Sequence, residues 1–259
     1  MFADLAFFSF VELLDQTQHR VYNEWHQLDH RPENLALPGV AWGDRWALND
    51  ACREHAVIGD EQYAGVDYTA MYWFRPPVKE SVRAWDELGE ASFQWGRGPL
   101  IPGVTRRLLG FFKPVKGYVS PHALVDAEVL PFRPNRGLHL TLSRFAESHS
   151  IETHEQLTWY DRVRLPDLMQ VDGVAGAWTF SFSHHQQHST LPLGSEATDA
   201  PGSLRIRLLY LDQDVIETTA RIREREAELD AAGRGAPRPG AEQILLSTPV
   251  RTIIPWQDW

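Results

Sequence analysis

Two related segments, one in each half of the chain, constrain the fold more than any other feature of the sequence. The first reads WHQLDHRPENLALPGVAW at positions 25–42, and a degenerate copy reads WYDRVRLPDLMQVDGVAG at positions 159–176. An ungapped alignment matches a tryptophan, a proline and a Gly-Val-Ala triplet, and an apolar stretch precedes each copy. We interpret the pair as an internal duplication, so the two halves are expected to share one topology.

The first half predicts the order strand, helix, strand, strand, helix, strand. Strands are expected at 5–13, 40–48, 66–74 and 106–119, with helices at 17–29 and 79–95. In the first helix, Val21, Trp25 and Leu28 form an apolar stripe that is expected to face the core. Pro32 lacks a backbone donor and disfavours helical geometry before it, so the helix is expected to break near His30.

The second half predicts the same order. Its strands are expected at 137–145, 174–182, 203–212 and 242–254, its helices at 153–171 and 215–232, and a long loop at 184–202. Residues 120–136 contain three prolines and read as a linker. The sequence therefore predicts two ferredoxin-like β-α-β-β-α-β repeats at 1–119 and 137–259.

The predicted strands are apolar on both alternations, which is typical of a sheet covered on both faces. Helices can cover one face of each four-stranded sheet, and the other sheet is the simplest cover for the second face. The fold class expected is therefore α+β, with the two repeats packed sheet to sheet or curled into one barrel. Each wholly buried aromatic side chain would contribute about 1.5–3 kcal/mol to that closure.

Composition excludes several classes of partner. Lys and Arg number 25 against 35 Asp and Glu, a net charge of −10 without a basic cluster, so nucleic-acid and anionic-membrane binding are not expected. The single cysteine, Cys52, cannot form an internal disulfide and favours a reducing compartment. No basic-then-apolar leader and no apolar run of about 20 residues occurs, so a cytoplasmic protein is expected.

The tandem order and the spacing W-x4-H-x-P followed by P-G-V resemble the dimeric α+β barrel superfamily, especially its EthD-like branch. In this chain the signature is carried by Trp25, His30, Pro32 and the segment 38–40. The resemblance implies a fused pseudo-dimer with helices outside a barrel and a pocket between sheet and helices or inside the barrel. The superfamily that this chain resembles includes cofactor-free cyclases, isomerases and monooxygenases as well as haem enzymes. The fold alone therefore does not select a function.

His30 is the leading candidate for catalysis, because imidazole both takes and gives a proton near neutral pH. It also falls in the signature, whereas the second copy carries Arg164 at the same place. The alternative is a histidine that only caps the last carbonyls of its helix. His26 and Tyr22 lie one and two helical turns before His30 and can form a proton relay with it, and Asp29 can orient an imidazole. The same residues can hold a metal only with a third ligand, and none is identifiable, so no metal is expected.

Aromatic and basic side chains on the strands are candidates for substrate binding. Trp42, Trp46 and Tyr72 can line a pocket for a flat ligand, although most such residues are core residues. Arg205 and Arg207 alternate with apolar residues and point to a covered face, where each needs either an acidic substrate or a structural carboxylate. His26 completes the predicted substrate-binding set.

A histidine tract at positions 184, 185 and 188 lies in the expected loop and is a candidate haem or metal site. Phosphate-binding glycine loops, dinucleotide fingerprints, nucleophile elbows and paired cysteines are missing from the sequence. The leading hypothesis is therefore a cofactor-independent enzyme of isomerase, cyclase or lyase type, acting on a carbonyl compound of aromatic or polyketide-like character. The alternatives are a haem- or oxygen-dependent monooxygenase and a non-catalytic ligand-binding protein, and a homodimer is left open.

Overall fold

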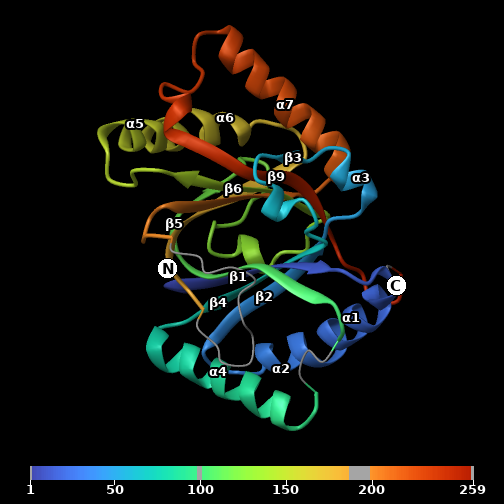
Figure 1. The fold of residues 1–259 in the computed structure, drawn as a ribbon. Coiled ribbons are helices and arrows are strands. Elements are labelled where there is room, and N and C mark those ends of the chain that lie inside the picture. The colour runs from blue at the N-terminus through green and yellow to red at the C-terminus, as the bar shows by residue number, and fades with distance from the viewer. Residues whose placement is uncertain (1, 98–100, 187–198, 258–259) are drawn as a thin grey trace.

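The computed structural model describes residues 2–97, 101–186 and 199–257. Each half contains the predicted order of elements (Figure 1). The first half comprises β1 (Leu5–Leu13), α1 (His19–Trp25), β2 (Val40–Ala47), β4 (Tyr68–Phe74), α4 (Val78–Gln94) and β5 (Val104–Val119). The second comprises β6 (Gly137–Phe145), α5 (Ile151–Trp159), β7 (Val174–His185), β8 (Leu204–Leu211), α7 (Val215–Ala231) and β9 (Glu242–Thr252).

Shorter elements connect these. They are α2 (Arg31–Leu35), α3 (Asp50–Arg53), β3 (Val57–Ile58) and α6 (Leu165–Leu168), together with four short 3-10 turns and two π-helical turns. Residues 120–136 form an irregular connection that contains one 3-10 turn, Leu130–Phe132. Among the helices of the described ranges, none is both long enough and apolar enough to cross a membrane.

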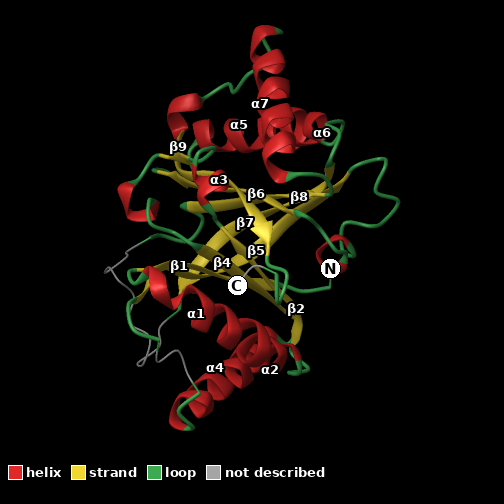
Figure 2. Ribbon diagram, turned by 90° about the vertical axis from the view of Figure 1, so that its right-hand side faces the viewer, coloured by secondary structure: helices red, strands yellow, loops and turns green. Residues whose placement is uncertain are grey.

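The strands of the described ranges belong to one antiparallel sheet, which closes on itself through the pairing of β2 with β9. The order is β2-β4-β1-β5-β7-β8-β6-β9-β3, and β2 also pairs with β9 through Trp46 with Thr252 and Ala47 with Arg251. The longer helices of the first half, α1 and α4, cover one side of this closed sheet, and those of the second half, α5 and α7, cover the other, with the strands between them (Figure 2). The short α3 of the first half contacts β9. The α+β barrel expected from the sequence is confirmed.

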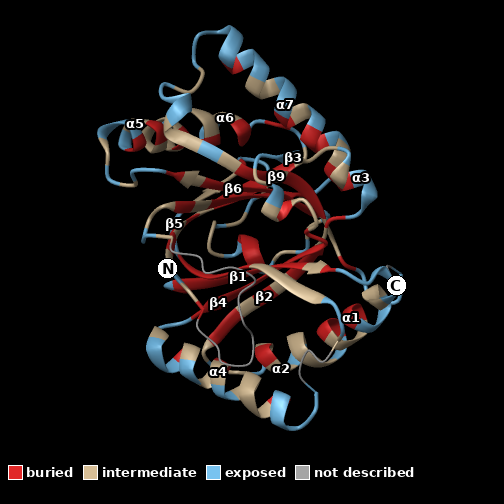
Figure 3. Ribbon diagram, viewed as in Figure 1, coloured by how far each residue is buried: buried red, intermediate tan, exposed pale blue. Residues whose placement is uncertain are grey.

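The inner faces of the strands form a dry core that both halves share. Phe8 of β1 lies 5.0 Å from Phe180 of β7, and Trp73 of β4 lies 5.3 Å from Trp178 of β7, measured between ring centroids. The central strands are accordingly the most continuously buried part of the chain (Figure 3). Because this core is filled by aromatic and aliphatic side chains, room for polar chemistry is left on the outer faces beneath the helices and at the ends of the barrel.

The predicted break of the first helix near His30 is wrong. The chain stays helical from His19 to Leu35, with a π-helical turn at His26–His30 in which the amide of Arg31 donates to the carbonyl of His26. A π turn widens the helix by one residue, and this lets the chain continue through Pro32, which can neither donate nor approach the carbonyl of the preceding turn closely. The second half has the same device, a π turn at Tyr160–Arg164 just before Pro166.

The predicted core stripe of this helix is also wrong. Val21 and Leu28 are 49% and 46% exposed, whereas Tyr22 and His26 are almost fully buried. The helix therefore turns its polar aromatic side toward the sheet. The π turn accounts for part of the difference, because it changes which residues lie above one another: the His30 ring stacks on Trp25 at 4.7 Å, five positions away.

Two strands differ from the expected pattern. β5 passes through Pro114 without ending, and the register with β7 shifts between Pro114 and Lys116 to absorb the missing donor. β7 extends to His185, so the first two histidines of the expected loop tract are strand residues, and His188 lies outside the described residues.

The register shifts within the two halves coincide. The pairing of β1 with β5 shifts between Phe10 and Val11, and that of β6 with β9 shifts at the matching place, between Leu142 and Ser143. The pairings of β2 with β4 and of β7 with β8 likewise shift at their first residues. These shared irregularities agree with the predicted duplication, which concerns ancestry and stays a prediction.

The close approach of β6 to β9 predicts a large effect of Gly137→Ala. A Cβ atom at Gly137 would lie 2.0 Å from the backbone carbonyl oxygen of Val250, so the two strands must separate. We expect the unfolding free energy to fall by about 2 kcal/mol or more, as for other overpacked sites. Gly240→Ala is the control, because nothing lies within 4 Å of a Cβ there. Urea unfolding measures both, and equal stability of the two variants would contradict this description of the sheet.

Candidate functional site

A cavity of about 90 Å³ lies in the first half between the outer face of the sheet and its helices. Its sheet side is formed by β1, β4 and β5, and its helix side by α1, the adjoining π turn and α4. The polar residues that line it are Ser9, Tyr22, His26, His30, Asn34, Tyr72, Asp86, Ser92, Arg106 and Gln186. Aromatic side chains from both sides, among them Phe7, Trp25 and Trp85, form the remaining surface.

The three residues predicted as a relay meet in this cavity. The rings of Tyr22 and His26 are 6.1 Å apart and those of His26 and His30 are 5.1 Å apart, measured between centroids. Burial, reinforced by the charges of Arg106 and Arg45, lowers the pKa of His30 to about 4. Burial also lowers the pKa of His26, and its Nδ1 has no hydrogen-bond partner. Both imidazoles are therefore neutral at physiological pH.

Two guanidinium groups lie near these imidazoles without a carboxylate. Arg106 of β5 lines the cavity and takes part in no ion pair or side-chain hydrogen bond among the described residues. Arg45 of β2 is fully buried, donates to Asn23 Oδ1 at 2.6 Å, and leaves Nε and Nη1 unpartnered. Its guanidinium lies 4.1 Å above the Tyr68 ring and 4.7 Å above the Tyr22 ring. Cation–π contacts thus replace part of the hydration of Arg45, but no anion balances its charge.

Two more donors at the cavity are unused. The hydroxyl of Tyr72 and the indole Nε1 of Trp85 have no hydrogen-bond partner, and their rings are 6.0 Å apart. Burial raises the pKa of Tyr72, so its hydroxyl keeps its proton. An unpaired buried donor costs about 1–3 kcal/mol, which a natural protein normally avoids unless a ligand supplies the acceptor.

The other predicted site residues lie away from the cavity. Asp29 faces Arg97 at 3.7 Å rather than either imidazole. Trp42 packs against Phe132, with ring centroids 5.4 Å apart, and Trp46 belongs to the inner core. Arg207 lies beneath the helices of the second half. Of the eight predicted residues, the cavity therefore brings together the following four: Tyr22, His26, His30 and Tyr72.

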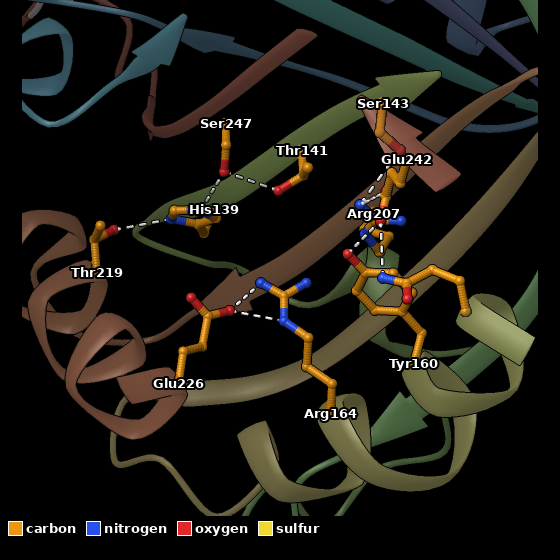
Figure 4. Close-up of polar contacts among 11 residues, drawn as sticks. His139, Thr141, Ser143, Tyr160, Arg164, Arg207, Thr219, Glu226, Glu242 and Ser247 are labelled. Atoms are coloured by element: carbon orange, nitrogen blue, oxygen red, sulfur yellow. Dashed lines mark hydrogen bonds and ion pairs between the residues drawn. The ribbon is translucent and has the colours of Figure 1, made fainter. Parts of the chain in front are cut away.

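In the second half, ion pairs occupy the corresponding space (Figure 4). Arg164, the counterpart of His30, pairs with Glu226 of α7. Arg207 of β8 pairs with Glu242 at the start of β9, and both side chains are less than a tenth exposed. The hydroxyl of Tyr160, the counterpart of His26, donates to Glu242 at 2.7 Å. Here Arg164 and Arg207 each have a carboxylate partner, whereas Arg205 on the strand of Arg207 leaves its buried Nε without a hydrogen-bond partner among the described residues.

His139 of β6 is a buried histidine that the sequence analysis did not single out. Its ring nitrogens contact Thr219 Oγ1 at 3.2 Å and Ser247 Oγ at 3.0 Å, and burial lowers its pKa to about 3. It is a satisfied structural group. Arg106 was also overlooked, although Arg106 and Arg107 are adjacent in a strand, where one of two neighbours must point to each face. Arg107 pairs with Glu12, which leaves Arg106 as the enclosed one.

The two described histidines of the expected metal tract have local partners. The His185 ring contacts the Leu109 carbonyl at 3.2 Å and Asp199 at 3.1 Å, so both of its nitrogens are engaged. His184 stacks on Phe111 and contacts Ser183. Within the described ranges, no group of three or more His, Cys, Asp or Glu side chains is arranged to hold a metal ion.

A larger groove of about 1650 Å³ lies at one end of the barrel, near the C-terminal part of β9. Arg53 pairs with Asp67 and Arg251 pairs with Asp214 along it. Because its charged side chains largely neutralise one another, we place the chemistry in the smaller cavity, where the polar groups lack partners.

No family model matches the sequence, and no curated protein is detectably similar to it. Solved structures are similar in fold. A proposed monooxygenase from Fusobacterium nucleatum aligns with a TM-score of 0.53 at 6% identity, covering 98% of this chain and 94% of that one. A Rhodococcus jostii DypB variant in complex with haem aligns at 0.51 with 11% identity, covering 96% and 93%. The encapsulated DyP-type peroxidase from Mycobacterium smegmatis aligns at 0.50 with 9% identity, covering 100% and 95%. At these identities the likeness concerns the fold alone.

The enclosed pair in the second half predicts a large penalty for Glu242→Gln. Removal of one partner leaves Arg207 charged and buried, and such losses cost about 3–5 kcal/mol. Glu24→Gln breaks the exposed pair of Glu24 with Arg20 and is expected to cost less than about 1 kcal/mol. Chemical denaturation at pH 7 measures both changes. Equal stability of the Glu242→Gln and Glu24→Gln proteins would show that the pair of Glu242 with Arg207 is not required to balance the buried charge of the second half.

Proposed function

We propose that the chain is a cofactor-independent enzyme that moves a proton on a small carbonyl compound, with His30 as the general acid/base. The observation that supports the proposal is a neutral imidazole in a cavity between sheet and helices, beside donors that have no partner. Groups with strongly shifted pKa values in a cavity are characteristic of catalytic sites. We also propose, from the signature that contains His30, that the chain is related to the EthD-like branch of the superfamily.

The reaction would be an enolisation. The neutral ring of His30 takes a proton from the carbon next to the substrate carbonyl, and the C–H electron pair becomes the C=C bond of the enolate. The carbonyl oxygen gains negative charge, which the Tyr72 hydroxyl, the Trp85 N–H and the Arg106 guanidinium can stabilise. The imidazolium then returns the proton to carbon or oxygen. Isomerisation, aldol-type cyclisation and some lyase reactions all begin with this step.

The cavity favours the small end of the predicted substrate range. A cavity needs about 10–15 Å³ to hold one buried water molecule, so the cavity of about 90 Å³ has room for several water molecules. A single aromatic ring with a short side chain matches this better than a multi-ring polyketide. Phe7 and Trp85 offer apolar surface for such a ring.

The haem alternative has weaker support. Pockets for drug-sized ligands span about 300–1,000 Å³, and the cavity beside His30 is smaller than this range. Both nitrogens of His185 are already engaged. The cavity beside His30 therefore does not fit a haem group. A ligand-binding protein without turnover is the remaining alternative, and the experiment below distinguishes it.

Proton–deuterium exchange tests the proposal directly. Exchange at the carbon next to the carbonyl of phenylpyruvate, and of the neutral ketone phenylacetone, is followed in D₂O by proton NMR. We expect acceleration by the wild-type protein with at least one compound, and a loss of about 10²–10⁴-fold in His30→Gln. His139→Gln is the control, because it replaces a buried histidine with a lowered pKa that lies outside the cavity.

The pH profile follows from the lowered pKa of His30. The neutral base is the active form, so kcat/KM should stay level as the pH falls and decline only toward pH 4. A decline centred near pH 6.5 would indicate an unperturbed histidine. Exchange no faster than in buffer for either compound, or equal rates in wild type and His30→Gln, contradicts the proposed function.

A further inference from the structure

The charges around the cavity of the first half do not balance. Arg45 is fully removed from water and Arg106 is partly buried, and neither guanidinium forms an ion pair with a carboxylate of the described residues. Asp86 of α4 also lines the cavity, but it accepts a hydrogen bond from Gln186 at 3.2 Å and has further interactions of its own. Buried charges in proteins are paired or hydrogen-bonded, because desolvation of an unpaired ion costs several kcal/mol.

The second half shows how the same framework balances such a charge. Glu242 is the first residue of β9 and pairs in register with Phe145 at the end of β6. The matching register in the first half is Val104, the first residue of β5, opposite Leu13 at the end of β1. A carboxylate thus enters the space between sheet and helix in one half, whereas a valine occupies its place in the other.

The contacts of Glu242 define what its carboxylate does. It pairs with Arg207, accepts a hydrogen bond from the Tyr160 hydroxyl at 2.7 Å, and has the Gln156 amide at 3.5 Å. In the first half, His26 replaces Tyr160 and Tyr22 replaces Gln156, while the cation is Arg106 on the strand of Val104. A cation and donors are therefore present in both halves, but in the first half no described carboxylate pairs with the cation, since Asp86 contacts Gln186 instead.

We propose that the cavity beneath α1 and α4 binds the carboxylate of a compact organic acid, with Arg106 as its ion-pair partner. The proposal deepens the proposed function, since it names an acidic class of ligand for the same cavity. Arg45 adds positive charge from behind Tyr22, and the Tyr72 hydroxyl and Trp85 N–H can donate to the ligand. The aromatic walls and the volume suit one ring next to the carboxylate, as in an arylalkanoic or aryl 2-oxo acid.

Binding of phenylacetate and of its neutral isostere phenylacetamide, measured by isothermal titration calorimetry at fixed ionic strength, tests the inference. Wild type is expected to bind the acid at least about tenfold more tightly than the amide, as a charge-assisted hydrogen bond would provide. Arg106→Gln should remove this preference. Arg107→Gln is the control, because that neighbour pairs with Glu12 and is absent from the cavity lining.

A second variant keeps the test independent of any folding defect in Arg106→Gln. Val104→Glu places a carboxylate at the register position of Glu242, two residues before Arg106. We expect this built-in anion to pair with Arg106, to abolish binding of phenylacetate, and to raise thermal stability above that of Val104→Gln.

The inference is overturned if the acid and the amide bind equally, if neither binds at millimolar concentration, or if Arg106→Gln retains the preference for the acid. It is also overturned if Val104→Glu binds phenylacetate as wild type does. These outcomes differ from those for catalysis. Binding of the acid without deuterium exchange would retain the carboxylate site and remove the proton-transfer function. Deuterium exchange of phenylacetone without tighter binding of phenylacetate than of phenylacetamide would retain the proton-transfer function and remove the carboxylate site.

Discussion

A positive charge that is taken out of water needs a counter-charge, and the two halves of this barrel meet that requirement in different ways. Beneath the helices of the second half, Arg207 and Arg164 each face a glutamate of the same chain. Beneath those of the first half, Arg106 and Arg45 have none, and two imidazoles are held neutral beside them. The two halves share one framework, but ion pairs fill the site of the second half, whereas the cavity of the first half has positive charge without a carboxylate partner. A bound carboxylate would therefore stabilise the first half most.

The closed sheet determines where such a cavity can lie. Pairing of β2 with β9 completes the ring, and its interior is filled by aromatic side chains of both halves. Only the outer faces remain, and there the spacing between strand and helix depends on which side chains the helix presents. The π turns at His26–His30 and Tyr160–Arg164 set that presentation in both halves. Such turns are frequent at functional sites, since they re-aim side chains without ending the helix.

Much of the fold could be predicted from the sequence, because it rests on local patterns. β1 and β6 have the predicted bounds, and β2 and β7 begin at the predicted residues, Val40 and Val174. What could not be predicted depended on tertiary context. Proline rules favoured a break at Pro32, but a widened turn accommodates this residue, and the helix side that looked apolar by spacing faces solvent.

The site was predictable in part for the same reason. His30 was identified by its place in the signature, Tyr22 and His26 by helical spacing from it, and Tyr72 as an aromatic strand residue. The four residues do meet at one cavity. Arg106 was missed because the role of a charged side chain depends on its partners. Sequence spacing cannot show that Glu12 pairs with Arg107 rather than with Arg106. The same limit applies to Glu242, whose role depends on strand register.

The pKa of His30 is the quantity that most directly tests the account, because burial and the unbalanced guanidinium charge both lower it. Titration of the assigned His30 ring resonances by NMR, in the free protein and with phenylacetate bound, gives that value in both states. The account predicts a pKa of about 4 in the free protein and a rise when the carboxylate offsets the charge of Arg106. A pKa near the usual 6.5 that does not respond to phenylacetate would contradict it.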